Sequence, residues 1–147
     1  MKQDAGSPPS ARIGSWATIA ATFATIAMTM LLLDLVWLGL VARDFYDSQL
    51  GSLKRPDVYW PAAVLFYAMY ITSILAYAVV GSATTIAALR RGAALGFVTY
   101  ATYELTNWAV IRDWPAALVP VDLLWGVVLT AVAGFAGKGV HLRLTAK

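Results

Sequence analysis

Three acidic residues lie within apolar stretches of this 147-residue sequence. Asp34 interrupts "LLLDLVWLGL", Glu104 lies within "YATYELTNWAV", and Asp122 follows "WPAALVPV". A carboxyl group in apolar surroundings is costly unless other polar groups contact it. Such carboxyls can take up protons, bind a polar ligand, form an acid and base pair, or join helices by hydrogen bonds.

Tyrosine, asparagine and tryptophan residues accompany the three acids at helical spacing. Trp37 and Trp125 lie three residues after Asp34 and Asp122, so each indole shares a helix face with its acid. Further polar and aromatic residues lie within one helical turn of Glu104. The candidate ligand-binding or proton-binding residues are Asp34, Glu104, Asp122, Tyr67, Tyr70, Tyr100, Tyr103, Asn107, Trp37 and Trp125. No catalytic residue is assigned.

Metal binding and nucleophilic catalysis lack their usual residues. The sequence has no cysteine and one histidine, His141, which lies near the C-terminal end. Carboxylate-bridged metal bundles use Glu-x-x-His pairs, and Ser-His-Asp or Cys-His catalysis needs a histidine. We therefore expect no bound metal and no cofactor, whereas acid–base catalysis by two carboxyls stays open.

The composition indicates which elements position these residues. The chain is 60% hydrophobic and 13% charged, against roughly 25% charged residues in soluble domains. A domain of this size cannot bury so much apolar surface, so a lipid bilayer is the expected surrounding. The formal net charge is +3, but the basic residues lie at the ends of apolar segments. This arrangement indicates membrane orientation and not nucleic-acid binding.

The apolar runs predict an all-α membrane protein, a bundle of four transmembrane helices. The spans cover about 16–42, 61–80, 92–111 and 116–136, each near the roughly 20 residues that cross the hydrocarbon core. Backbone groups in lipid must be hydrogen-bonded internally, which favours helices. We expect 1–15 to form a flexible cytoplasmic tail, 16–136 the transmembrane domain and 137–147 a basic cytoplasmic tail.

The basic residues predict the orientation of the bundle. Four spans place both termini on one side, together with Lys2, Arg12, Arg90, Arg91, Lys138, Arg143 and Lys147. The other side holds Arg43, Lys54, Arg55 and Arg112. Since positive charge is more frequent in cytoplasmic segments, both termini are expected in the cytoplasm.

The three acids lie at similar depth in this arrangement. At 1.5 Å per residue, each is roughly 12–14 Å below the non-cytoplasmic boundary. Intramembrane carboxyls usually face the interior of a bundle, so we expect the three to converge. Tyr67, Tyr70 or Tyr103 are the expected partners, and the connection 43–60 could cover the outer mouth of the bundle.

Two stretches of the sequence resemble each other. "DLVWLGLVARD" aligns with "ELTNWAVIRD" when one residue is skipped, and "WPAAVLFYA" aligns with "WPAALVPVD". The two helical hairpins are therefore candidate copies, related by a pseudo-twofold axis along the membrane normal. Chance similarity within so restricted an alphabet is the alternative.

The same motifs resemble a known family. "DLVWLGLVARDFYDSQLG", "WPAAVLFYAMYI" and "YATYELTNWAVIRDWPAALVPVDLLWG" are similar to the bacterial integral-membrane family catalogued as domain of unknown function 2177, over about residues 30–136. The resemblance implies a small four-span membrane protein of bacterial type, and we expect it in the inner (cytoplasmic) membrane. It implies no biochemical activity.

Several functions stay open at this point. The acids could bind or translocate a proton, a small solute or the head of a lipid-soluble molecule. A second hypothesis is a membrane enzyme acting on a lipid or isoprenoid, with Asp122 and Glu104 as acid and base. A third is an accessory subunit. The purely structural alternative is that the acids only join helices. The expected partners are the lipid bilayer and either a second copy of the chain or a larger membrane complex.

Overall fold

The computed structural model describes residues 15–146, and every regular element in that part is helical. The predicted tail 1–15 lies, apart from Ser15, outside the described residues. The elements are α1 (Trp16–Val36), the π-helical turn η1 (Trp37–Val41), α2 (Arg43–Leu50), the 3₁₀ turn η2 (Gly51–Leu53), α3 (Trp60–Ser73), the π-helical segment η3 (Ile74–Val80), α4 (Thr85–Val110) and α5 (Leu118–Thr145).

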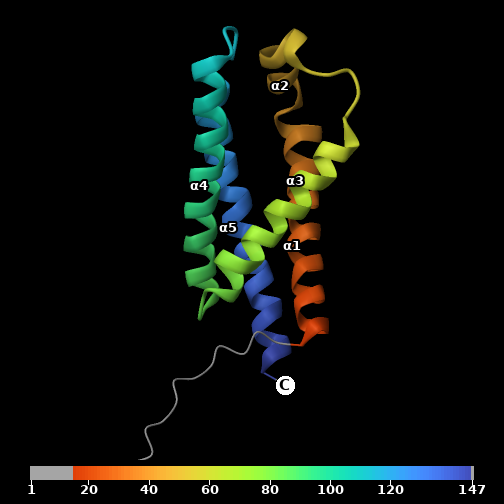
Figure 1. Ribbon diagram of the computed structural model, residues 1–147, viewed down its shortest axis with the longest axis vertical. Coiled ribbons are helices and arrows are strands. Elements are labelled where there is room, and N and C mark those ends of the chain that lie inside the picture. Colours follow the sequence, from red (N-terminus) through yellow and green to blue (C-terminus); the bar gives the residue numbers. More distant parts are fainter. Residues whose placement is uncertain (1–14, 147) are drawn as a thin grey trace, which may run out of the picture.

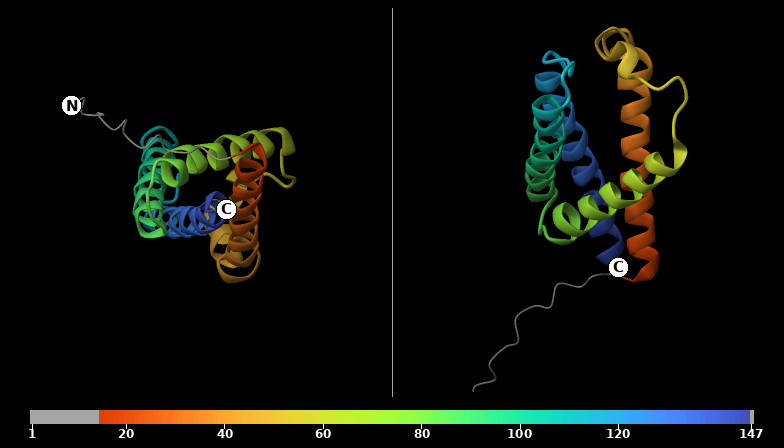
Figure 2. Two further views of the ribbon diagram at one scale, coloured as in Figure 1. Left: turned by 90° about the horizontal axis from the view of Figure 1, so that it is seen from below. Right: turned by 45° about the horizontal axis from the view of Figure 1, so that its top comes forward.

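Four long helical segments run alternately up and down the molecule (Figure 1). The start of α1, the turn between η3 and α4, and the end of α5 lie at the lower end (Figure 2). α2 and the connection between α4 and α5 lie at the upper end. The segment α3–η3 leans across the bundle, from α1 at the top to α4 at the bottom. The predicted site residues on α1, α4 and α5 consequently lie in the upper half.

Side-chain hydroxyls mark the starts of two of these segments. The Ser15 hydroxyl accepts a hydrogen bond from the Thr18 amide at 3.2 Å, and Thr84 does the same for the Ala87 amide at 3.1 Å. Such caps satisfy amides that have no partner within the helix. Because Thr84 caps α4, this helix begins before Arg90 and includes it. The predicted apolar span began only at 92, after the charged residues.

Glycines allow α4 and α5 to approach closely. A Cβ atom at Gly92 would lie 2.5 Å from the Thr130 carbonyl oxygen, and one at Gly96 would overlap the Gly126 carbonyl. A Cβ at Gly126 would in turn overlap the Tyr100 ring. Small residues of this kind let two membrane helices pack backbone against backbone. α4 and α5 therefore form the most extensively packed helix pair.

The two helical hairpins are packed differently. α4 and α5 are in contact along much of their length, whereas α1 and α3 make few contacts and α1 packs mainly on α5. The core lies where α1, η3 and α5 meet, around Ile26, Met30, Ile74 and Leu129. Both hairpins rise and then descend in the same order, but the internal duplication stays a prediction.

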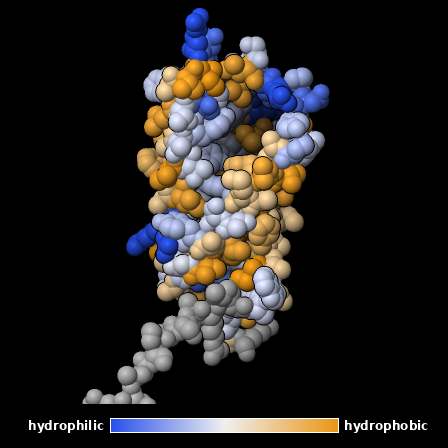
Figure 3. All heavy atoms as spheres, in the orientation of Figure 1, coloured by the Kyte–Doolittle hydropathy of each residue, from blue (hydrophilic) through white to orange (hydrophobic). Residues whose placement is uncertain are grey.

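Large apolar side chains cover the outside of the bundle. Leu40 and Val110 are each 79% exposed, and apolar residues spread over the face in Figure 3. Among residues 15–146, three segments are long and apolar enough to cross a membrane: Trp16–Val41, Trp60–Val80 and Leu118–Thr145. These features define an all-α membrane protein. α4 does not reach the same apolar character and carries Arg90, Arg91 and Glu104.

The last helix extends further than the apolar run that predicted it. α5 continues to Thr145, whereas the predicted span ended at 136. Lys138 and His141, expected in a cytoplasmic tail, are both buried on this helix. A charged residue ends an apolar run in the sequence, but it does not end a helix.

Candidate functional site

Asp34 joins three helices through its two carboxyl oxygens. The Tyr67 hydroxyl on α3 donates to Asp34 Oδ2 at 2.9 Å, and the Trp125 indole N–H on α5 donates to Oδ1 at 3.2 Å. The Asp34 side chain on α1 is only partly buried. Each carboxylate oxygen can accept a further hydrogen bond, so the group keeps acceptor capacity on its open side. We call Asp34, Tyr67 and Trp125 the Asp34 cluster.

Asp122 is covered by a residue from the short helix α2. The Tyr46 hydroxyl donates to Asp122 Oδ1, and the Trp37 indole N–H lies 3.4 Å from the Tyr46 oxygen. Burial and the neighbouring Asp122 carboxyl raise the pKa of Tyr46 well above its usual range. The phenol consequently stays protonated and acts as the donor. α2 thus provides a direct partner for an acid on α5.

Glu104 is the most deeply buried of the three acids. Its side chain on α4 is 0% exposed, and Oε2 accepts a hydrogen bond from the Trp114 indole N–H at 2.9 Å. Its other oxygen, Oε1, is buried without a hydrogen-bond partner among the described residues. The Asp122 carboxyl is its neighbour. We call Glu104 and Asp122 the carboxyl pair.

Two stacked tryptophans connect the Asp34 cluster with the carboxyl pair. The rings of Trp37 and Trp125 lie 4.6 Å apart, with 7° between their planes. Trp125 donates to Asp34, while Trp37 approaches the hydroxyl that donates to Asp122. The polar contacts therefore form one continuous arrangement across α1, α2, α3 and α5.

Four other predicted residues have different surroundings. Tyr70 shares a 2.7 Å hydrogen bond with the Thr130 hydroxyl and not with a carboxyl. Tyr100 lies 6.4 Å from Tyr70 between ring centroids, and Tyr103 packs its edge against Trp114. Asn107 is half-buried on α4. Of the three tyrosines expected as partners, Tyr67 is the one that donates to a carboxyl.

Two contributors were not among the predicted residues. Tyr46 lies in the connection that was expected to cover the bundle, and no helical spacing relates it to Asp122. Trp114 precedes the last predicted span and was given no role in the site. A buried indole N–H needs an acceptor, and this requirement could have indicated the contact between Trp114 and Glu104.

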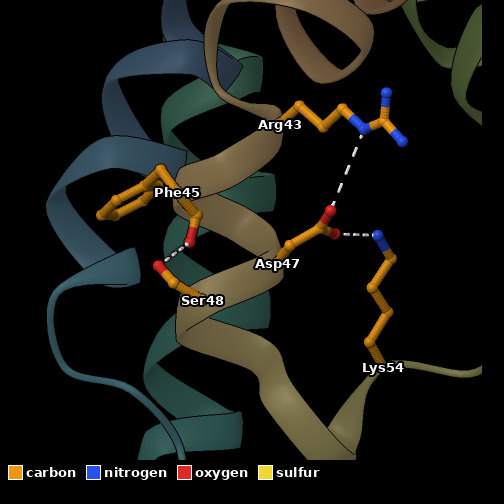
Figure 4. A network of polar contacts seen from close by, with 5 residues as sticks. All are labelled: Arg43, Phe45, Asp47, Ser48 and Lys54. Carbon is orange, nitrogen blue, oxygen red and sulfur yellow. Dashed lines mark hydrogen bonds and ion pairs between the residues drawn. The ribbon is translucent and has the colours of Figure 1, made fainter.

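An ion pair fastens α2 to the chain that follows it, and two further polar contacts lie within the helix (Figure 4). Asp47 forms an ion pair with Lys54 and lies 4.0 Å from Arg43, and the Ser48 hydroxyl donates to the Phe45 carbonyl at 2.8 Å. The Lys54 ammonium lowers the pKa of Asp47 below its usual value. These contacts hold the turn that presents Tyr46 to the site.

An open groove between α1 and α3 reaches the Asp34 cluster. Its upper part has a volume of about 530 Å³ and is lined by Asp34 and Tyr67 together with apolar residues. A second part of about 350 Å³ extends it toward Phe23 and Ile71. The two parts share the lining residues Leu31, Trp60, Ala63 and Tyr67. We call the whole cavity the α1–α3 groove.

A separate cavity of about 390 Å³ lies between α3 and α4, lined by Phe66, Thr99, Tyr100 and Tyr103. Figure 3 shows that the upper half of this face is hollowed. The lining of this cavity is three aromatic residues and a threonine, without a carboxyl. Within the part of the chain that the structure describes, no three His, Asp or Glu side chains are placed to hold a metal ion.

The helical architecture and the acids held inside it define a multi-pass type of membrane protein. Residues 19–138 match the family described as predicted membrane protein DUF2177. The chain belongs to this family, as its motifs indicated. Comparison with curated proteins gave no match. Comparison with solved structures gave none either.

Proposed function

We propose that the protein binds a lipid-soluble molecule in the α1–α3 groove, with the polar head of that molecule at the Asp34 cluster. The observation that carries the proposal is the composition of the groove. One end contains a carboxylate and a phenol, while the rest is lined by aliphatic and aromatic side chains. Pockets that combine an apolar wall with a few placed polar groups are typical of ligand sites.

The dimensions of the groove support a ligand with a long apolar chain. Its lining on α1 and η1 extends from Phe23 to Gly39. At 1.5 Å per residue, this is roughly 24 Å along the helix, which is most of the hydrocarbon thickness. The groove is open along its side, so a molecule dissolved in the bilayer can enter without crossing water.

The chemistry of Asp34 favours a head group that donates hydrogen bonds. Each carboxylate oxygen already accepts one protein hydrogen bond and retains a free lone pair. A hydroxyl or amine on the ligand would donate to a free lone pair of Asp34. A cationic amine would also compensate the negative charge of the carboxylate. A phosphate or carboxylate head would be repelled.

We place the Asp34 cluster in the outer half of a bacterial inner membrane, with all four long segments crossing it and both termini in the cytoplasm. The lower end carries Arg90, Arg91 and Arg143, consistent with the cytoplasmic excess of positive charge. α4 is included as a span because it packs along α5. Translocation, as opposed to binding, would require a dimer or a larger complex, since four helices enclose little volume.

Proton binding by the carboxyl pair is a second candidate function. The unpartnered Oε1 of Glu104 supports it, because a proton held between Glu104 and Asp122 would supply the missing hydrogen bond. Two neighbouring carboxylates also repel each other, which favours sharing one proton. Such a pair could drive ligand exchange or act as acid and base on a lipid substrate.

Photo-crosslinking in detergent micelles tests the binding proposal. The probes are a diazirine-labelled long-chain amine, the corresponding alcohol, and the methyl ether, which cannot donate a hydrogen bond. We expect the amine and alcohol to label the α1–α3 groove in the wild type. Asp34→Asn should reduce labelling by the amine about tenfold, in line with the loss of a charged hydrogen bond.

The control removes the same charge outside the groove. Asp44 is exposed at the start of α2, so Asp44→Asn should leave labelling unchanged. Equal labelling of the wild type and Asp34→Asn, or equal labelling by the ether and the alcohol, would contradict the proposal.

A further inference from the structure

The lower end of the molecule contains an open basic cavity with buried polar side chains in its wall, away from the site described above. The cavity has a volume of about 360 Å³ and lies where η3, the following turn and the end of α5 meet. The lining residues on α5 are three or four positions apart, so they lie on one face of the helix. The lining residues are Val80, Ser82, Ala83, Lys138, His141, Leu142 and Thr145.

Three polar residues of this cavity are buried, and two of their atoms lack partners among the described residues. Lys138 and His141 are each 4% exposed, and Ser82 is 7% exposed. The Ser82 hydroxyl and His141 Nδ1 have no hydrogen-bond partner among the described residues. Buried polar atoms are nearly always hydrogen-bonded. The two atoms without a protein partner therefore indicate a further partner, such as a bound ion.

The positive charge of Lys138 also has no acidic partner among the described residues. Within residues 15–146, no acidic side chain lies within ion-pair distance of Lys138. The described acids all belong to the upper half: Asp34, Asp44, Asp47, Asp57, Glu104, Asp113 and Asp122. A buried ammonium without a counter-charge is costly, so the cavity favours an anion.

A second cation stands next to the cavity. The Arg91 guanidinium donates to the Gly81 carbonyl at 2.5 Å, one residue before Ser82, and packs over the Tyr77 ring at 4.3 Å. This contact holds the turn that carries the Ser82 hydroxyl. An ammonium, a hydroxyl and an imidazole then converge on one small volume, a donor set that suits an oxyanion with several acceptor oxygens.

We propose that the cavity formed by Ser82, Lys138 and His141 binds a phosphate group, from either a phospholipid head group or inorganic phosphate. It is independent of the α1–α3 groove, which favours a hydrogen-bond donor. The cavity lies at the end of a membrane-spanning helix, where phospholipid head groups are found.

Thermal unfolding and native mass spectrometry of the purified protein in a phosphate-free detergent test this assignment. The probes are inorganic phosphate, phosphatidylglycerol and diacylglycerol, all in chloride buffer. Saturable stabilisation by inorganic phosphate would indicate a free anion. Stabilisation by phosphatidylglycerol but not by diacylglycerol or inorganic phosphate would indicate a lipid head group. No saturable effect of either phosphate compound would overturn the proposal.

The variants Lys138→Met and Arg143→Gln form a matched pair. Both remove one positive charge from the same end of α5, but Arg143 is exposed. Lys138→Met should weaken phosphate binding about tenfold or more, since a charged hydrogen bond is lost. Arg143→Gln should bind as the wild type does, and equal losses in both variants would overturn the proposal. Ser82→Ala removes only a hydroxyl, so a severalfold loss is expected there even if Lys138→Met fails to fold.

Discussion

The indole rings of Trp37 and Trp125 lie parallel, 4.6 Å apart, at the centre of the polar contacts. Stacking of this kind contributes about 0.5–1.5 kcal/mol beyond the burial of the rings. We therefore expect a double-mutant cycle of Trp37→Leu and Trp125→Leu to give a coupling energy of about 1 kcal/mol. Unfolding in detergent measures it, and additive effects would show that the two rings stabilise the protein independently.

Tyr46→Phe should destabilise the folded protein by about 1–3 kcal/mol. The variant removes the donor to Asp122 and leaves a partly buried carboxyl without its partner. Tyr59→Phe is the control, because Tyr59 is 59% exposed and the same hydroxyl is lost there. Similar stability of both variants would mean that α2 does not hold Asp122 in place.

Glu104→Gln and Asp122→Asn should accumulate in the membrane like the wild type, yet behave like a deletion strain. The amide side chains keep the size and can hydrogen-bond, but they cannot take up and release a proton in the physiological range. The measurements are membrane abundance, growth and lipid profile. Full complementation by the double variant would leave the carboxyl pair with a structural role alone.

Glu104→Leu separates folding from function. This variant leaves the Trp114 indole N–H without its acceptor, so we expect a loss of about 1–3 kcal/mol in unfolding free energy. Glu104→Gln retains an acceptor oxygen for the same N–H and should remain close to the wild type. If both variants unfold alike, the contact with Trp114 contributes nothing measurable.

Gly96→Ala should destabilise the bundle by about 2 kcal/mol or more, because its Cβ would overlap the Gly126 carbonyl and force α4 away from α5. Gly39→Ala is the matched control, since no atom lies within 4 Å of a Cβ at that position. Thermal unfolding of the two variants in one detergent compares them. A change of less than 0.5 kcal/mol at Gly96 would contradict the close approach of these helices.

The absence of cysteine from the sequence allows a clean test of orientation. Single cysteines at the exposed positions Asp57 and Asp113 each place a thiol at the upper end, and one at Arg143 places a thiol at the lower end. A membrane-impermeant maleimide added to intact cells should label the first two and not the third. Labelling at Arg143→Cys in intact cells would reverse the proposed topology.

The sequence predicted the helical membrane fold because long apolar runs are compatible with few other structures. It also indicated Asp34, Glu104 and Asp122, since acids in apolar runs stand out. It did not indicate Tyr46, whose contact with Asp122 depends on how α2 folds back over the bundle. Helical periodicity also cannot show which of several tyrosines on one helix face contacts an acid. Tyr67 and Tyr70 are one helical turn apart, but one donates to Asp34 and the other pairs with Thr130.

The lower cavity was missed for a related reason. Lys138 and His141 follow the last long apolar run, so they were interpreted as a solvated tail. Their burial depends on η3 and the turn around Ser82, which the sequence places far from α5. Contacts between distant segments are therefore the part of this protein that composition and spacing could not provide.

The π-helical segments indicate where relatives of this protein can differ by an inserted or deleted residue. In η1 and η3 the backbone bonds reach back five residues, as Ala42 to Trp37 and Gly81 to Ala76 do. A π turn is equivalent to one residue inserted into an α-helix. Removing one residue within 74–80 would restore a regular helix without rotating α3 relative to α4. We expect relatives that differ in length by one residue inside a helix to differ within 37–41 or 74–80.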